Sequence, residues 1–289
     1  MSRPDSPAGH AVARPAIRPG LLGRELTSEL SLVFRRRRNA IVLMLIATVP
    51  VLIGTAVKVS APKPGEGPPF IAQVSGNGLF LTFTALTVCL PVFLPLAVAI
   101  VAGDAVAGEA NAGTLRYLLT VPVGRTRVLV VKALGVLAYL AAAVMTVSLV
   151  ALITGAALFG LHPVTLLSGD TVPITNGLQR ALAVTIFVAV DLVGLAAIGL
   201  FFSTLTEVPV GAMAATLGVA VAFAILDSIP QLGSLRGLML THHWLDFGEL
   251  LRRSPQTSQL LRFSLVPLAY AALFGTAAWA RLSNADITS

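Results

Sequence analysis

Long apolar runs separated by short polar segments dominate the chain. Each run is long enough to supply the roughly 20 apolar residues that a helix needs to cross the core of a bilayer. We place these runs at residues 40–59, 79–103, 128–160, 178–204, 208–228 and 261–281. The pattern therefore predicts an all-α membrane protein with six transmembrane helices.

A different pattern precedes the first apolar run. Apolar residues such as Leu22, Leu26 and Leu30 recur every four positions among charged side chains. This spacing is typical of an amphipathic helix that lies in the membrane interface. The residues before it show no apolar period and are rich in proline and glycine, which indicates disorder. The expected division is a disordered cytoplasmic tail over 1–20, an amphipathic interfacial helix over 21–38 and a six-helix transmembrane domain over 39–282.

Composition strengthens the membrane assignment. Hydrophobic residues make up 56% of the chain and charged residues 11%, against roughly 45–50% and 25% in soluble domains. The single cysteine, Cys89, lies inside an apolar run, so the sequence offers no disulfide framework and no metal-binding or redox pair of cysteines. A soluble domain is excluded.

The net charge of +7 comes from basic residues that flank the apolar runs. Such residues anchor helix ends at anionic headgroups and mark the cytoplasmic side, so we assign them to membrane orientation and expect no nucleic-acid partner. The expected protein is a multi-pass protein of the plasma membrane with both termini in the cytoplasm. The expected interfacial anchors are Arg35, Arg36, Arg37, Arg38, Arg125, Arg127 and Lys132, the last reaching back toward water from within the third run.

The segment 229–260 is the exception to this orientation, because it is basic yet would lie outside. Its leucines, together with Trp244 and Phe247, favour an amphipathic helical cap or a re-entrant pair at the interface. His242, His243, Asp246 and Glu249 have the spacing of metal ligands on a helix, but no second cluster completes the coordination. We expect no bound metal.

Two prolines, Pro91 and Pro95, interrupt the second apolar run. Each removes a backbone donor, so a kink is expected in this span.

The polar segment after the second run is the candidate for a functional contact. Asp104 and Glu109 are followed by Gly113-Thr114, by an apolar edge of leucines and by Pro122, which ends a short helix. Such a helix just below the membrane suits docking to a cytoplasmic partner. The alternative is an ordinary solvated loop.

The same segment resembles a known family. The sequence Glu109-Ala-Asn-Ala-Gly-Thr114, the following leucines, Pro122-Val123 and the basic pair before Lys132 are similar to permease subunits of ABC-2 type transporters. An elbow helix, six spans and an outer helical element before the last span extend this resemblance over about residues 21–282. The chain departs from the family pattern at Ala133, where glycine is usual, and at Asn111 and Ala112, where charged residues are usual.

The resemblance implies a permease that pairs with a second permease copy or a paralogue and with a separate ATPase subunit. That ATPase would bind ATP and Mg²⁺, while this chain would form the substrate pathway and hold no cofactor. No GxxxxGK[ST] phosphate-binding loop occurs in the sequence. The resemblance implies a cytoplasmic coupling helix whose contact residues with the ATPase are Asp104, Glu109, Gly113, Thr114, Leu115, Arg116, Leu118, Leu119 and Pro122.

One acidic residue, Asp191, lies near the middle of the fourth run. An ionised carboxylate there costs roughly 2.5–3.5 kcal/mol on insertion scales, so it should face the bundle interior or a cavity. It either lines a substrate path or is satisfied by a hydroxyl such as that of Thr185. An ion-coupled secondary transporter is therefore the main alternative function, and a structural anchor is another.

An enzyme is not expected, because the sequence contains neither an HExxH nor a GxGD element, and no catalytic residue is assigned. Spans rich in Ala, Val, Leu and Gly favour a hydrophobic or amphipathic substrate. The resemblance implies export.

Overall fold

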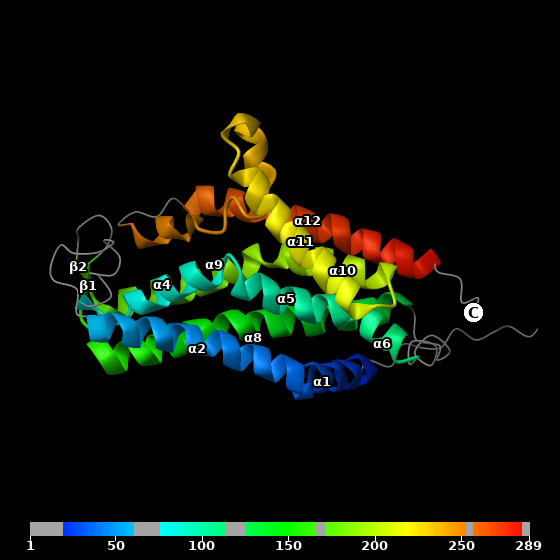
Figure 1. Ribbon diagram of the computed structural model, residues 1–289, viewed down its shortest axis with the longest axis horizontal. Coiled ribbons are helices and arrows are strands. Elements are labelled where there is room, and N and C mark those ends of the chain that lie inside the picture. Colours follow the sequence, from blue (N-terminus) through cyan, green and yellow to red (C-terminus); the bar gives the residue numbers. More distant parts are fainter. Residues whose placement is uncertain (1–19, 61–75, 114–124, 166–170, 253–256, 285–289) are drawn as a thin grey trace, which may run out of the picture.

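The computed structural model describes residues 20–60, 76–113, 125–165, 171–252 and 257–284, and these form a bundle of helices with a common long axis (Figure 1). The α-helices are α1 (Gly20–Arg35), α2 (Arg37–Ser60), α4 (Phe80–Cys89), α5 (Phe93–Asp104), α6 (Ala107–Asn111), α8 (Arg125–Phe159), α9 (Ile174–Asp191), α10 (Val193–Leu205), α11 (Pro209–Asp227) and α12 (Thr257–Asn284). Two 3₁₀ helices are η1 (Pro230–Leu238) and η2 (Asp246–Leu251), and two short strands, β1 (Val164–Thr165) and β2 (Thr171–Val172), pair antiparallel.

The described helices have the length and composition of a membrane protein. Five helical segments are long and apolar enough to cross a membrane, or six if α4 and α5 form one bent span. The five are α2, α8, α9 with α10, α11 and α12, so the helices fall on the six predicted apolar runs. The expectation of an all-α membrane protein is confirmed.

The bend between α4 and α5 lies where the prolines predicted a kink. The two helices meet at 56°, and Pro91 lies in the break between them. Pro95 is the third residue of α5, where the backbone N–H of a first turn has no acceptor within the helix. Pro91 therefore accounts for the break, and Pro95 is accommodated in regular helix.

The core lies between the central helices. The largest fully buried side chains include Leu86, Leu94, Tyr139 and Leu195. At Gly78 and Gly155 the backbones of neighbouring segments touch, because a Cβ atom added to Gly78 would lie 2.1 Å from the Gly155 carbonyl oxygen. The outermost spans are α11 and α12, whose most apolar stretches are only 17% and 11% buried.

The bundle has two different ends (Figure 1). We call the end formed by α1, α6, the start of α8 and the finish of α12 the charged end, and the end that carries β1 and β2 the hairpin end. Contacts hold the charged end together: Arg127 forms an ion pair with Glu25 at 2.7 Å, and Trp279 Nε1 donates to Thr126 Oγ1 at 2.8 Å. The described beginning and end of the chain therefore lie at the same end.

The amino-terminal helix differs in extent from the expected interfacial helix over 21–38. It ends at Arg35, and α2 starts at Arg37, so the basic run is divided by a break at Arg36. Asn39 stabilises this break, because its side-chain Nδ2 donates to the Val33 carbonyl oxygen at 2.8 Å and satisfies an acceptor at the end of α1. The tail over 1–20 lies outside the described residues except for Gly20.

The segment before the last span is helical, but in short pieces. It contains η1 and η2, with a kink at Gly233, whose φ of 52° favours glycine. The part that includes η1 projects from the side of the bundle (Figure 1), while Trp244, Phe247 and Leu251 are buried. An amphipathic helical cap or a re-entrant pair was expected, and the structure shows two 3₁₀ helices with buried side chains in and before η2.

Candidate functional site

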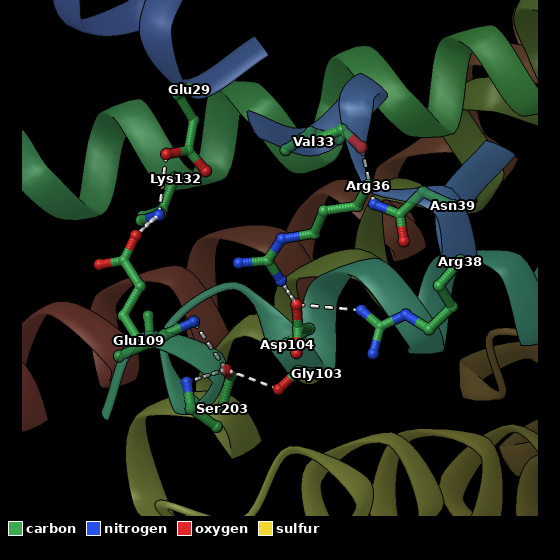
Figure 2. A network of polar contacts seen from close by, with 12 residues as sticks. Glu29, Val33, Arg36, Arg38, Asn39, Gly103, Asp104, Glu109, Lys132 and Ser203 are labelled. Atoms are coloured by element: carbon green, nitrogen blue, oxygen red, sulfur yellow. Dashed lines mark hydrogen bonds and ion pairs between the residues drawn. The ribbon is translucent and has the colours of Figure 1, made fainter. Parts of the chain in front are cut away.

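Six charged side chains gather at the charged end of the bundle (Figure 2). Three are carboxylates and three are cations, so their formal charges balance. We call this set the charged cluster; its members are Glu29, Arg36, Arg38, Asp104, Glu109 and Lys132. They come from α1, the α1–α2 break, α2, α5, α6 and α8 and form two groups of ion pairs, one centred on Lys132 and one on Asp104.

Lys132 connects the two glutamates of the cluster. Its ammonium donates to Glu29 Oε2 at 2.8 Å and also to Glu109 Oε1. Lys132 is 6% exposed and Glu29 is 8% exposed, so the bridge is largely removed from solvent. The expectation that Lys132 reaches back toward water is wrong, because two carboxylates inside the protein take the place of water.

A glycine makes room for this bridge. Gly135 lies three residues after Lys132, on the same face of α8. A Cβ atom added to Gly135 would lie 2.9 Å from Glu29 Cγ. The missing side chain therefore lets α1 approach α8 closely enough for Glu29 to reach Lys132.

Asp104, the last residue of α5, forms the second half of the cluster. Its Oδ2 accepts ion pairs from Arg36 and from Arg38, the latter at 2.9 Å. Arg36 lies in the α1–α2 break and Arg38 is the second residue of α2. A Cβ atom added to Gly108 would lie 2.7 Å from Asp104 Oδ1. Asp104 thus joins the end of α5 to the α1–α2 break and to the start of α2.

The two halves border one small cavity. Its volume is about 20 Å³, which is room for about one water molecule. Glu29 and Lys132 line one part of it, and Arg36 and Asp104 line another. The cavity therefore lies between the two halves: the Lys132 bridge is largely buried, whereas the Arg36 and Arg38 side chains are 42% and 43% exposed.

Ser203 of α10 holds the start of α6. Its Oγ accepts hydrogen bonds from the backbone N–H groups of Val106 and Ala107, both at 2.9 Å, and donates to the Gly103 carbonyl oxygen at 2.8 Å. This is the role of a helix N-cap, supplied here by another helix. Sequence reasoning missed Ser203, because it lies within an apolar run and has no local pattern around it.

Only part of the predicted coupling loop can be placed. Asp104 and Glu109 belong to the charged cluster, and Gly113 follows α6 with a φ of 68° in an exposed turn. Six predicted contact residues lie outside the described residues: Thr114, Leu115, Arg116, Leu118, Leu119 and Pro122.

The other predicted anchors lie at the charged end. Arg35 and Arg37 are exposed there. Arg125 donates to the carbonyl oxygens of Leu282 and Ser283 at 3.2 and 2.7 Å, which ties the start of α8 to the finish of α12.

Asp191 lies apart from the charged cluster, at the end of α9. It is 1% exposed, and neither carboxylate oxygen has a hydrogen-bond partner among the residues that the structure describes. The Thr185 hydroxyl was an expected partner, but it lies 2.9 Å from Ser148 Oγ and donates to the Ala181 carbonyl oxygen at 2.7 Å. Of the two alternatives for Asp191, a bond to the Thr185 hydroxyl is therefore not the one that the described residues show, because Thr185 forms its bonds within α9 and with α8.

The histidines near η2 are divided between two carboxylates. His242 Nδ1 lies 2.5 Å from Asp227 Oδ1, and His243 Nδ1 lies 2.7 Å from Asp246 Oδ2. Within the described ranges, no three His, Cys, Asp or Glu side chains gather as a metal site would require.

Comparison with known proteins identifies one family. A search of curated proteins finds no match. The family model described as a protein of unknown function (DUF2705) matches residues 39–288. The match includes Asp104, Glu109, Lys132, Asp191 and Ser203. It begins after Glu29, Arg36 and Arg38, the three members of the charged cluster that come first in the sequence. Because it covers most of the chain, the protein belongs to the DUF2705 family.

Proposed function

We propose that the chain is the permease subunit of an ABC-2 type transporter, which forms the substrate pathway and couples to a separate ATPase subunit. A second permease copy or a paralogue would complete the membrane part. The observation that carries the proposal is the buried contact of Glu109 with Lys132 and, through it, with Glu29. It joins the short helix α6, after the second span, to the amphipathic helix α1 and to the third span.

This arrangement suits mechanical coupling. α6 is bound to α1 and α8 through Lys132, is capped by Ser203 of α10 and follows directly on α5. A partner that displaces the loop over 104–127 would therefore move several spans together, with the break at Pro91 as a point of flexure. ATP and Mg²⁺ would be bound by the partner.

The proposed orientation places the charged end in the cytoplasm of a plasma-membrane protein. α1, α6 and the finish of α12 lie at that end, and the exposed side chains of Arg35 and Arg37 lie there too. Exposed arginines next to a span favour the cytoplasmic side. Both termini would then be cytoplasmic, α1 would be the elbow helix and the segment with η1 and η2 the outer element.

The proposed substrate is hydrophobic or amphipathic and is exported. Ionisable groups are few along the spans, and the described helices bury mainly Leu, Val and Ala. A pathway lined by such side chains would bind apolar molecules better than small ions.

The ATPase activity of a purified permease–ATPase complex tests this coupling. Glu109→Gln weakens the link between α6 and Lys132, so we expect stimulation of the ATPase by the permease to fall while the complex stays assembled. Glu207→Gln is the matched control, because Glu207 is exposed in the turn between α10 and α11. Equal stimulation by wild type and Glu109→Gln would contradict the proposal.

A second candidate is an ion-coupled secondary transporter without an ATPase. Asp191 favours it, because its buried carboxyl group has no hydrogen-bond partner among the described residues, and buried acidic groups within spans are typical of proton or cation pathways. The two functions separate in proteoliposomes that contain only this chain. Uptake driven by a pH gradient and abolished by Asp191→Asn would favour the secondary transporter.

A further inference from the structure

A cavity lies toward the hairpin end of the bundle, well away from the charged cluster. Its volume is about 420 Å³, inside the roughly 300–1,000 Å³ of small-molecule sites. It lies between α4, α8 and α9. Its wall contains several exposed apolar side chains, namely Met145, Leu149, Leu178 and Leu182. The cavity therefore opens at the apolar outer surface of the helices.

The wall of the cavity contains three buried hydroxyl groups, those of Thr82, Ser148 and Thr185. Thr82 is 1% exposed, and its hydroxyl has no hydrogen-bond partner among the described residues. Thr185 and Ser148, also in the wall, are bonded to each other at 2.9 Å. A buried hydroxyl without a partner is uncommon in proteins, and here it borders an open space. A ligand with a hydrogen-bonding group would satisfy it.

The position of the cavity indicates how such a ligand would lie. Thr175 and Gln179 line the cavity and belong to the first turns of α9, toward the hairpin end. They are exposed, whereas Thr185 and Ser148, further along the helices, are buried. Polar side chains therefore line the cavity both near the end of the bundle and on its buried side, whereas Met145, Leu149, Leu178 and Leu182 form its exposed apolar side. No lining residue carries a charge.

We propose that this cavity binds a single-chain amphipathic molecule, with its alkyl or acyl chain against Leu149 and Leu182 and its uncharged, hydrogen-bonding head group between Gln179 and Thr82. An uncharged head group follows from the uncharged wall, because an ion there would lack a counter-charge. The bound molecule would be the substrate of the proposed permease, so this inference rests on the proposed function.

Photolabelling of the purified full chain, without any ATPase, tests the binding. The probe is a monoacylglycerol with a diazirine in its acyl chain, and adducts are located by mass spectrometry. We expect them on residues 145–152 and 175–185. Leu149→Trp fills the cavity and should lower this labelling about tenfold, a loss of roughly 1.4 kcal/mol. Ile153→Trp is the control, because Ile153 is exposed on the same helix outside the cavity.

A second variant probes the polar group without filling space. Thr82→Val keeps the shape of the side chain and removes the hydroxyl. We expect the half-saturating probe concentration to rise about two- to tenfold, as for one lost hydrogen bond. An alkyl diazirine without a head group should be insensitive to this change. Equal labelling of wild type and Leu149→Trp, labelling spread evenly over α11 and α12, or a dimer whose second copy covers the cavity would overturn the proposal. ATPase stimulation is a separate readout, so failure here leaves the permease proposal standing.

Discussion

At the scale of single residues, Lys132 is a buried charge with two carboxylate partners. Its ammonium lies between the carboxylates of Glu29 and Glu109, so removing it takes the cation from the buried Glu29 and one ion pair from Glu109. Breaking a buried ion pair in this way costs about 3–5 kcal/mol. We therefore expect Lys132→Met to lower the melting temperature of the purified protein strongly.

The control for this prediction is Lys58→Met, at the hairpin end, where the lysine is exposed and donates to the Leu158 carbonyl oxygen. Its effect should stay within about 1 kcal/mol. The triple variant Glu29→Gln, Glu109→Gln, Lys132→Met should recover part of the lost stability, since no buried charge then stands alone. If the Lys132→Met protein were as stable as the Lys58→Met protein, the ion pairs of Lys132 would contribute nothing to the stability of the fold.

Substitution of Asp191, unlike that of Lys132, should leave the melting temperature unchanged. Its carboxylate oxygens have no partner within the described chain, so Asp191→Asn removes no hydrogen bond and Asp191→Leu removes a buried polar group. We expect neither variant to lower the melting temperature. Thr185→Val, which breaks the bond to Ser148, should cost about 1 kcal/mol. A large loss in Asp191→Asn would instead assign that carboxyl a structural role.

At the scale of elements, α6 is short and is held by groups outside itself. Ser203 of α10 caps its first N–H groups. In Ser203→Ala the amides of Val106 and Ala107 lose their acceptor, so hydrogen exchange at these amides should accelerate. Thr204→Ala is the control, because that hydroxyl bonds within its own helix, to the Phe201 carbonyl oxygen. Unchanged exchange in Ser203→Ala would show that α6 is held without the cap.

The elements were largely predictable from sequence, whereas their contacts were not. Helix positions follow from apolar runs, and the break at Pro91 follows from the missing backbone donor, because both are local properties of the chain. The pairing of Glu29 with Lys132 joins residues 103 positions apart, and spacing within a helix carries no information about such a partner. For the same reason Lys132 was expected at the interface and Ser203 was not identified.

At the scale of the whole molecule, the orientation of the bundle can be measured directly. The only cysteine, Cys89, is buried, so a Cys89→Ala protein provides a background for single cysteines. Asn111 is exposed at the charged end and Thr171 at the hairpin end. We expect a membrane-impermeant maleimide to label Thr171→Cys in intact cells and Asn111→Cys only after permeabilisation. The reverse pattern would place the charged end outside and exclude docking of a cytoplasmic ATPase on α6.

In the proposed function, a separate ATPase acts on this chain through the loop after the second span. The most direct test is to purify the tagged chain in mild detergent from its native host and to identify the proteins that accompany it. We expect a stoichiometric protein with a P-loop, which is lost when Glu109 and Leu118 are both substituted but retained when Glu207 is substituted. Repeated recovery of the chain alone, still able to transport in proteoliposomes, would contradict it.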